Sequence, residues 1–216
     1  MMRNVPKSLA LILLVTIGME CQVLLNRDQL AAWVPSYLTA TTIDVHDRSI
    51  SLIDSGTFSS LTKLSSLDLR YNELINIVSN TFDDLINLTY LSLWSNQLSL
   101  IDPKTFSNLK KLDTLDLGDN HLTTLDPTTF DSLANLEYLH LDYNQLTSIL
   151  PSTFSRLVEL RWLYLENNNL ISIDRQSFVG LLYLEIVYLG NNPISLTQPS
   201  YVTQLCSTNP KCNIYL

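Results

Sequence analysis

Residues 88–96 read LTYLSLWSN and residues 112–120 read LDTLDLGDN, so the two stretches share one pattern at a shift of 24 residues. An asparagine recurs at the same 24-residue interval, at Asn72, Asn96, Asn120, Asn144, Asn168 and Asn192. All six phenylalanines also follow it, at Phe58, Phe82, Phe106, Phe130, Phe154 and Phe178. A fixed period of this size predicts a solenoid, in which each repeat stacks on the next.

Each repeat contains a short alternating segment, such as Leu91-Ser92-Leu93, that is typical of a strand with one buried face. Because the segment recurs once per repeat, its copies should stack in parallel, and we expect about seven strands. The inward leucines should form one continuous core with the phenylalanines. These leucines include Leu67 and Leu69, Leu115 and Leu117, Leu139 and Leu141, Leu163 and Leu165, together with Leu85, Leu109, Leu133, Leu157 and Leu181.

This pattern resembles the leucine-rich-repeat family, specifically its 24-residue extracellular type, over about residues 40–196. The resemblance implies an α/β-type solenoid, a horseshoe with a parallel β-sheet on its concave side and irregular or 3-10 structure on its convex side. It also implies protein recognition on the concave face. The asparagine and phenylalanine columns are interpreted as structural, because a residue repeated in every layer serves the repeat itself.

Both ends depart from the repeat, as expected where a terminal layer needs a cover. Residues 19–39 are predicted to form an N-terminal cap in which Trp33, Val34 and Tyr37 act as a lid. Arg48 stands where the other repeats have asparagine. Residues 197–216 are predicted to form a C-terminal cap, with SYVTQLC as a short amphipathic turn.

The N-terminus has the features of a secretory signal. Arg3 and Lys7 precede an apolar run from Leu9 to Gly18 that is too short to span a membrane. We expect residues 1–18 to be a signal peptide cleaved after Gly18, and the mature chain to be secreted and soluble. No second long apolar run follows.

Three cysteines allow one disulfide. Strands about 4.8 Å apart separate the first and seventh by roughly 29 Å, whereas a disulfide needs Cα atoms within about 7 Å. Cys206 and Cys212 are therefore the predicted pair in an oxidising compartment. Cys21 is then left over, and either bridges two molecules in a dimer or is a partly buried thiol under the N-terminal cap.

The composition argues against several functions. The net charge of −8 and the pI near 4.7 disfavour a nucleic-acid partner. None of the five glycines falls in a phosphate-binding motif, and His46, His121 and His140 lie in different repeats without a zinc-binding pattern. We therefore predict no enzyme, no cofactor and no metal site, and interpret the run around Asp116 and Asp119 as a solvated turn rather than a calcium site. Asn87, in Asn87-Leu88-Thr89, is the predicted glycosylation acceptor.

The residues that point outward from the strands are free of the packing constraint and carry what is individual to this protein. Two of the three tryptophans and six of the ten tyrosines fall at these positions, with acids beside them. An aromatic centre with a charged rim is typical of a protein-binding surface. The predicted partner-binding residues are Tyr90, Trp94, Asp116, Tyr138, His140, Asp142, Trp162, Tyr164, Glu166 and Tyr188.

We expect a protein partner with a basic or neutral surface and no membrane span. Two alternatives stay open. Aromatic residues on neighbouring strands can stack and stabilise the sheet by themselves, at about 0.2–1 kcal/mol per pair. The chain can also be a structural matrix component that assembles with itself.

Overall fold

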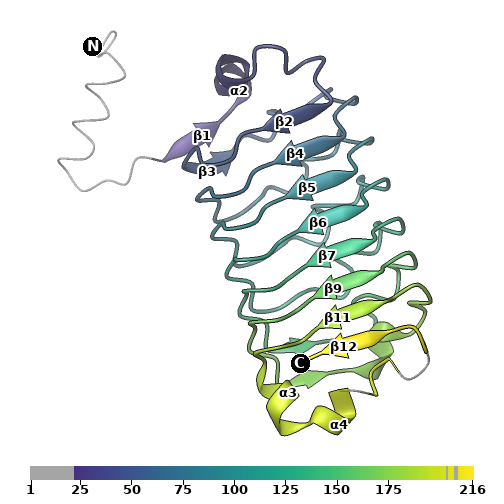
Figure 1. Cartoon of the computed structure of the whole chain (residues 1–216). Coiled ribbons are helices and arrows are strands. Elements are labelled where there is room, and N and C mark those ends of the chain that lie inside the picture. The colour runs from purple at the N-terminus through teal and green to yellow at the C-terminus, as the bar shows by residue number, and fades with distance from the viewer. Residues whose placement is uncertain (1–21, 203, 207–208) are drawn as a thin grey trace, which may run out of the picture.

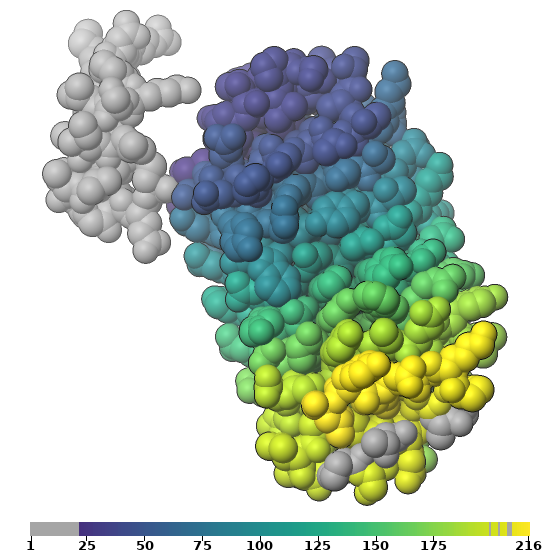
Figure 2. Space-filling view, in the orientation of Figure 1, coloured from purple at the N-terminus to yellow at the C-terminus, as the bar shows by residue number. Residues whose placement is uncertain are grey.

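The computed structural model describes residues 22–202, 204–206 and 209–216. Its main sheet consists of parallel strands stacked one per repeat (Figure 1). The eight strands, in spatial order, are β2 (Thr42–Asp44), β4 (Ser66–Asp68), β5 (Tyr90–Ser92), β6 (Thr114–Asp116), β7 (Tyr138–His140), β9 (Trp162–Tyr164), β11 (Ile186–Tyr188) and β12 (Asn213–Tyr215). The space-filling view shows the repeats as successive bands along the molecule (Figure 2). The predicted parallel solenoid is therefore confirmed.

The strand register keeps the sequence period. Leu67 lies opposite Leu91, Leu91 opposite Leu115, and Leu139 opposite Leu163. Each of these leucines is fully buried, which leaves their neighbours in the strands to face outward. The seven recurring strands lie where the sequence predicted them.

The eighth strand, β12, was not predicted. It pairs with β11 so that Tyr215 lies opposite Tyr188, a step of 27 residues rather than 24. Between the two strands the chain forms α3 (Pro193–Thr197) and α4 (Pro199–Val202) before it returns to the sheet. Because this detour breaks the period, the repeat pattern contains no signal for β12.

The opposite side of the core is mostly turns, as the predicted irregular convex side requires. Two small parallel pairs lie there, β1 (Val23–Leu25) with β3 (Ile50–Ile53), and β8 (Ser148–Ile149) with β10 (Ser172–Ile173). A 3-10 helix, η1, covers Arg175–Phe178. The phenylalanine column runs along this side, and the ring centroids of Phe58 and Phe82 are 6.1 Å apart. These rings fill the back of the core, as predicted.

The asparagine column forms a hydrogen-bond ladder. Asn120 Nδ2 donates to the carbonyl oxygens of Leu93, Leu117 and Gly118 at 3.0–3.1 Å, and its Oδ1 accepts from the Leu98 amide at 3.0 Å. The other asparagines repeat this arrangement at their own turns. Each amide thus satisfies backbone groups of two adjacent repeats in the buried interior, which confirms the structural interpretation.

The N-terminal cap contains α2 (Arg27–Trp33), whose first turn is capped by the Asn26 side chain. Trp33, Val34 and Tyr37 are partly buried and pack against the first layer of the core. The guanidinium of Arg48 lies 5.3 Å from the Trp33 ring centroid. Arg48, which replaces asparagine in the first repeat, therefore contacts the N-terminal cap through a cation–π interaction.

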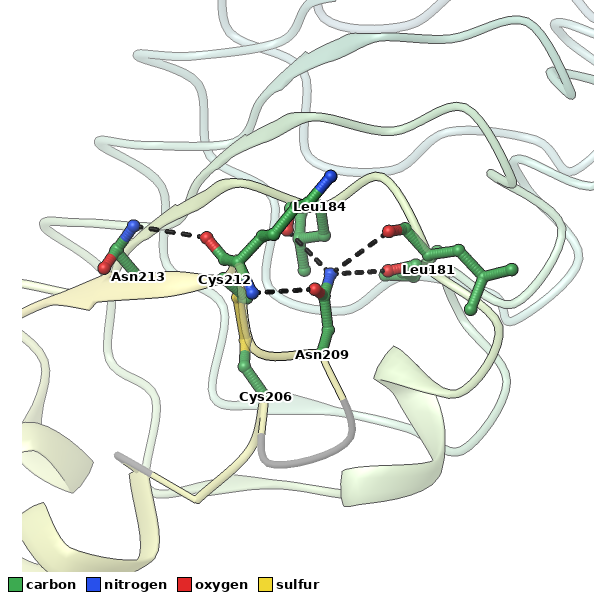
Figure 3. Close-up of a disulfide and its surroundings, with 8 residues drawn as sticks. Leu181, Leu184, Cys206, Asn209, Cys212 and Asn213 are labelled. Carbon is green, nitrogen blue, oxygen red and sulfur yellow. Dashed lines mark hydrogen bonds between the residues drawn. A yellow bond between two sulfur atoms is a disulfide. The ribbon is translucent and has the colours of Figure 1, made fainter.

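The C-terminal cap contains the predicted disulfide between Cys206 and Cys212 (Figure 3). Next to it, Asn209 Nδ2 donates to the carbonyl oxygens of Leu181 and Leu184 at 3.1 and 2.8 Å. Val202 and Leu205 are buried against the last layer. Within the described part of the chain, no helix is long and apolar enough to cross a membrane.

Candidate functional site

The outward-facing residues of the eight strands, with those of the turn after each strand, make up what we call the sheet face. It corresponds to the face predicted from the sequence as concave. Its acids are Asp44, Asp47, Asp68, Asp116, Asp119, Asp142 and Glu166, and its arginines are Arg48 and Arg70. The sheet face is therefore negatively charged.

A ladder of stacked rings crosses the C-terminal half of the sheet face. His140 stacks on Tyr164 with ring centroids 4.1 Å apart and an interplanar angle of 8°. Tyr164 stacks on Tyr188 at 5.0 Å, and Tyr188 on Tyr215 at 5.1 Å. We call His140, Tyr164, Tyr188 and Tyr215 the aromatic ladder. Consecutive strands supply its rings at one register position, so strand spacing brings them into contact.

A second aromatic group borders the ladder. Trp162 meets Tyr138 edge to face at 5.5 Å and lies 6.3 Å from Tyr164. Burial raises the pKa of Tyr164 to about 12, and the neighbouring Tyr188, Glu166 and Asp142 add to the shift. The Tyr164 hydroxyl therefore stays protonated at physiological pH.

Trp94 extends over the next repeat, which has a glycine, Gly118, at the corresponding position in the turn after β6. A Cβ atom on Gly118 would lie 2.2 and 2.4 Å from two Trp94 ring atoms and 3.1 Å from Asp142 Oδ1. The indole meets Tyr143 edge to face at 6.1 Å. Gly118 thus provides the space that the Trp94 ring occupies near Asp142.

Replacing Gly118 with alanine is expected to displace the Trp94 indole from this space. The fold should survive with a loss of about 1 kcal/mol, because the clash is with the movable end of a side chain. Tryptophan emission should shift to longer wavelength as the indole becomes hydrated. Gly56→Ala is the matched control, since nothing lies within 4 Å of its Cβ position. Unchanged emission in Gly118→Ala would contradict the packing of Trp94 over Gly118.

Three acids gather under and beside these rings. Asp116 accepts hydrogen bonds from Ser92 Oγ at 2.9 Å and the Gly118 amide at 3.2 Å. Asp142 is only 5% exposed, and burial together with the charge of Glu166 raises its pKa to about 7. Burial also raises the pKa of Asp116 and of Glu166. Asp142 Oδ1 and Glu166 Oε2 are buried and have no hydrogen-bond partner.

The N-terminal half of the sheet face is organised by ion pairs instead. Arg70 binds Asp68 through two nitrogens, with Nη2 2.6 Å from Oδ2. Asp44 Oδ1 lies 2.5 Å from His46 Nδ1. The ligand atoms of Asp44, His46 and Asp68 lie within 4.8 Å of one another. Because Arg70 already neutralises Asp68, this group has an internal counterion.

The structure brings most of the predicted partner-binding residues together over β5 to β11. Tyr90 is separate from the aromatic ladder, beside Ser92 and Arg70, and burial raises its pKa. Three contributors were not among the predicted partner-binding residues: Gly118 and Tyr143, which lie next to Trp94, and Tyr215 at the end of the aromatic ladder. Gly118 interrupts a column that is otherwise mostly bulky, which is the one sequence signal that could have pointed to the Trp94 packing.

Comparison with known proteins agrees with this architecture. The sequence matches the family described as leucine rich repeat over residues 39–98, 86–146 and 135–194. The chain belongs to the leucine-rich-repeat family. No curated protein gives a significant match to this leucine-rich-repeat sequence.

Two solved structures show how this leucine-rich-repeat chain relates to larger proteins. The crystal structure of a TLR13–ssRNA13 complex is 30% identical at a TM-score of 0.76, covering 89% of this chain and 26% of that one. The leucine-rich-repeat protein LIC12759 of Leptospira interrogans is 26% identical at a TM-score of 0.67, covering 82% of this chain and 48% of that one. This chain therefore spans about a quarter of the first structure and about half of the second.

The predicted glycosylation acceptor lies in the turn before β5. Asn87 Nδ2 donates to the Thr62 carbonyl oxygen at 2.7 Å, and Lys111 Nζ lies 2.6 Å from its Oδ1. Glycosylation of Asn87 stays a prediction. The signal peptide, its cleavage after Gly18 and the dimer through Cys21 fall on residues 1–21, outside the described residues.

Proposed function

We propose that this leucine-rich-repeat chain is a secreted recognition scaffold, without enzymatic activity, that binds a protein partner on its sheet face. The leucine-rich-repeat fold commonly mediates protein–protein recognition. The observation that carries the proposal is the combination of the aromatic ladder with buried acids that have no partner. Rigid aromatic rings around charged groups are typical of binding hot spots.

Ring stacking by itself explains only part of this surface. The close contacts among His140, Tyr164 and Tyr188 support the alternative in which the rings stabilise the sheet. Stacking does not account for Asp142 and Glu166, because each unpaired buried oxygen costs free energy that the fold alone does not require. A partner that pairs with these groups does account for them.

The negative sheet face also favours one class of partner. TLR13 is bound to single-stranded RNA in its crystal structure. Here the sheet face has seven acids, Asp44, Asp47, Asp68, Asp116, Asp119, Asp142 and Glu166. It has two arginines, Arg48 and Arg70, and Arg70 is paired with Asp68. Phosphates would be repelled by such a surface, whereas a basic protein surface would be attracted.

Replacing both Trp162 and Tyr164 with alanine is expected to abolish partner binding while the far-ultraviolet circular dichroism stays unchanged. These two rings connect the aromatic ladder to the Tyr138 group, so their removal takes away the centre of the surface. The measurement is affinity capture from extracellular fluid, identification by mass spectrometry, and repeat binding with the purified partner below the melting temperature of both proteins.

Tyr183→Ala is the matched control, because this tyrosine is 52% exposed and lies outside the sheet face. Equal capture by the wild type and the double variant would refute the proposal. Capture of further copies of the same chain alone would favour the self-assembling matrix component.

A further inference from the structure

We propose that Asp142 and Glu166 form a socket for a guanidinium group, which receives an arginine side chain of the partner. The inference rests on the proposed function and names the chemistry that the partner presents. It is carried by the positions of these two carboxylates, the rings around them and the absence of a neutralising base among the described residues nearby.

The two carboxylates come from equivalent positions of adjacent repeats. The Tyr143 amide donates to the Glu166 carbonyl oxygen at 3.0 Å, which places the turn after β7 directly beside the turn after β9. Asp142 Oδ1 and Glu166 Oε2 are both buried and lack hydrogen-bond partners. Two like charges held at adjacent positions repel each other, and a cation between them would relieve that repulsion.

Among the described residues, no lysine or arginine forms an ion pair with Asp142 or Glu166. Arg161 binds Glu137 at 3.0 Å and Glu185 at 2.9 Å, and Arg70 is paired with Asp68. His140 Nδ1 is 3.8 Å from Asp142 Oδ1, which is too long for a hydrogen bond. Burial lowers the pKa of His140 against the opposing charge of Asp116, so its ring is neutral at pH 7 and supplies no positive charge.

The rings that surround the carboxylates fit a planar cation. Trp94 lies near Asp142 across Gly118 and meets Tyr143 edge to face, and Tyr164 lies close enough for its hydroxyl to be affected by both acids. A guanidinium is planar, stacks on aromatic rings and donates to two carboxylates at once, which an ammonium does less well. The arginine reaches Asp142 when the Trp94 indole moves off Gly118 and stacks on the guanidinium.

Binding should be coupled to the release of a proton. The titratable groups facing Asp142 are Asp116 and Asp119 from the repeat of β6, His140 on its own strand, and Glu166 and Tyr164 from the repeat of β9. The acids among them favour the protonated form of Asp142 in the free protein. A bound guanidinium favours the ionised form, so arginine binding should strengthen as the pH rises through about 7.

The test uses acetyl-Gly-Arg-Gly-amide as the probe and the same peptide with citrulline in place of arginine as the uncharged control. Binding to the full chain is followed by the carbon-13 shifts of the Asp142 and Glu166 carboxyl groups between pH 5.5 and 8.5. We expect a saturable response to the arginine peptide only. Asp142→Asn and Glu166→Gln should each weaken it tenfold or more, whereas Asp131→Asn, an exposed acid outside the sheet face, should not change it.

Three results would overturn the socket: equal binding of the citrulline peptide, undiminished binding to Asp142→Asn, or saturation of both carboxyl groups by Ca²⁺ without a response to arginine. These outcomes can be told apart from a failure of the proposed function. If a partner is captured through Trp162 and Tyr164 but no arginine peptide binds, only the socket is wrong. If the peptide binds but no partner is captured, the recognition function is wrong.

Discussion

Replacing Asn120 with leucine is expected to lower the free energy of unfolding by about 3 kcal/mol or more. Leucine has the same branched shape but removes four hydrogen bonds, and the buried Leu98 amide loses its side-chain acceptor. The carbonyl oxygens of Leu93, Leu117 and Gly118 each keep one other donor, from Asn96, Asn144 and the Ser95 amide. The unsatisfied amide costs about 1–3 kcal/mol, each of the three other lost hydrogen bonds costs about 0.5–1.5 kcal/mol, and local relaxation recovers part of the sum. Chemical denaturation followed by circular dichroism measures the effect.

Asn169→Leu is the matched control for this experiment. Asn169 also lies in a repeat turn, but it is exposed, so the same substitution should change the free energy of unfolding by less than about 0.5 kcal/mol. Because each asparagine joins two repeats, Asn120→Leu should also weaken the coupling between the N-terminal and C-terminal halves. Equal stability of the two variants would contradict the ladder.

Replacing Asp142 with asparagine is expected to make the protein more stable than the wild type at pH 8. This gain in the free energy of unfolding should be smaller at pH 4. Burial and the charge of Glu166 raise the pKa of Asp142 from 3.8 to about 7. Below pH 4 the carboxyl is protonated in both the folded and the unfolded state, so it costs nothing. Between about pH 4 and 7 only the unfolded state ionises, and the wild type progressively loses stability; above pH 7 the loss is complete.

The size of this effect follows from the two pKa values. One pH unit corresponds to about 1.4 kcal/mol, so the difference between variant and wild type should grow by about 2–4 kcal/mol from pH 4 to pH 8. Urea denaturation at both pH values measures it, and Asp131→Asn controls for the change in net charge. A difference that is the same at pH 4 and pH 8 would mean that Asp142 ionises normally. A stabilised Asp142→Asn variant would also show that its loss of arginine binding is not a loss of fold.

Most of the fold could be predicted because the sequence repeats its core residues every 24 positions. Once Leu91 and Leu93 point inward in one repeat, the 24-residue step places their counterparts inward in every other repeat. The same step aligns the asparagines and the phenylalanines, so the ladder and the packing at the back of the core follow as well. The pairing of Cys206 with Cys212 was predictable for a related reason, since the repeat count predicts two ends of the solenoid too far apart for a disulfide.

The sequence by itself also determined which residues face outward, and hence the membership of the candidate surface. Only the tertiary structure decided how those side chains interact, because contacts across strands depend on side-chain length and on gaps in neighbouring columns. Gly118 leaves room for the Trp94 ring near Asp142, and Asp142 is a buried carboxyl with a raised pKa rather than the rim acid that the sequence predicted. Tyr215 joins the aromatic ladder although it lies 27 residues after Tyr188, a separation that the 24-residue repeat does not predict. A period specifies position, whereas burial and pairing arise only when the repeats are packed together.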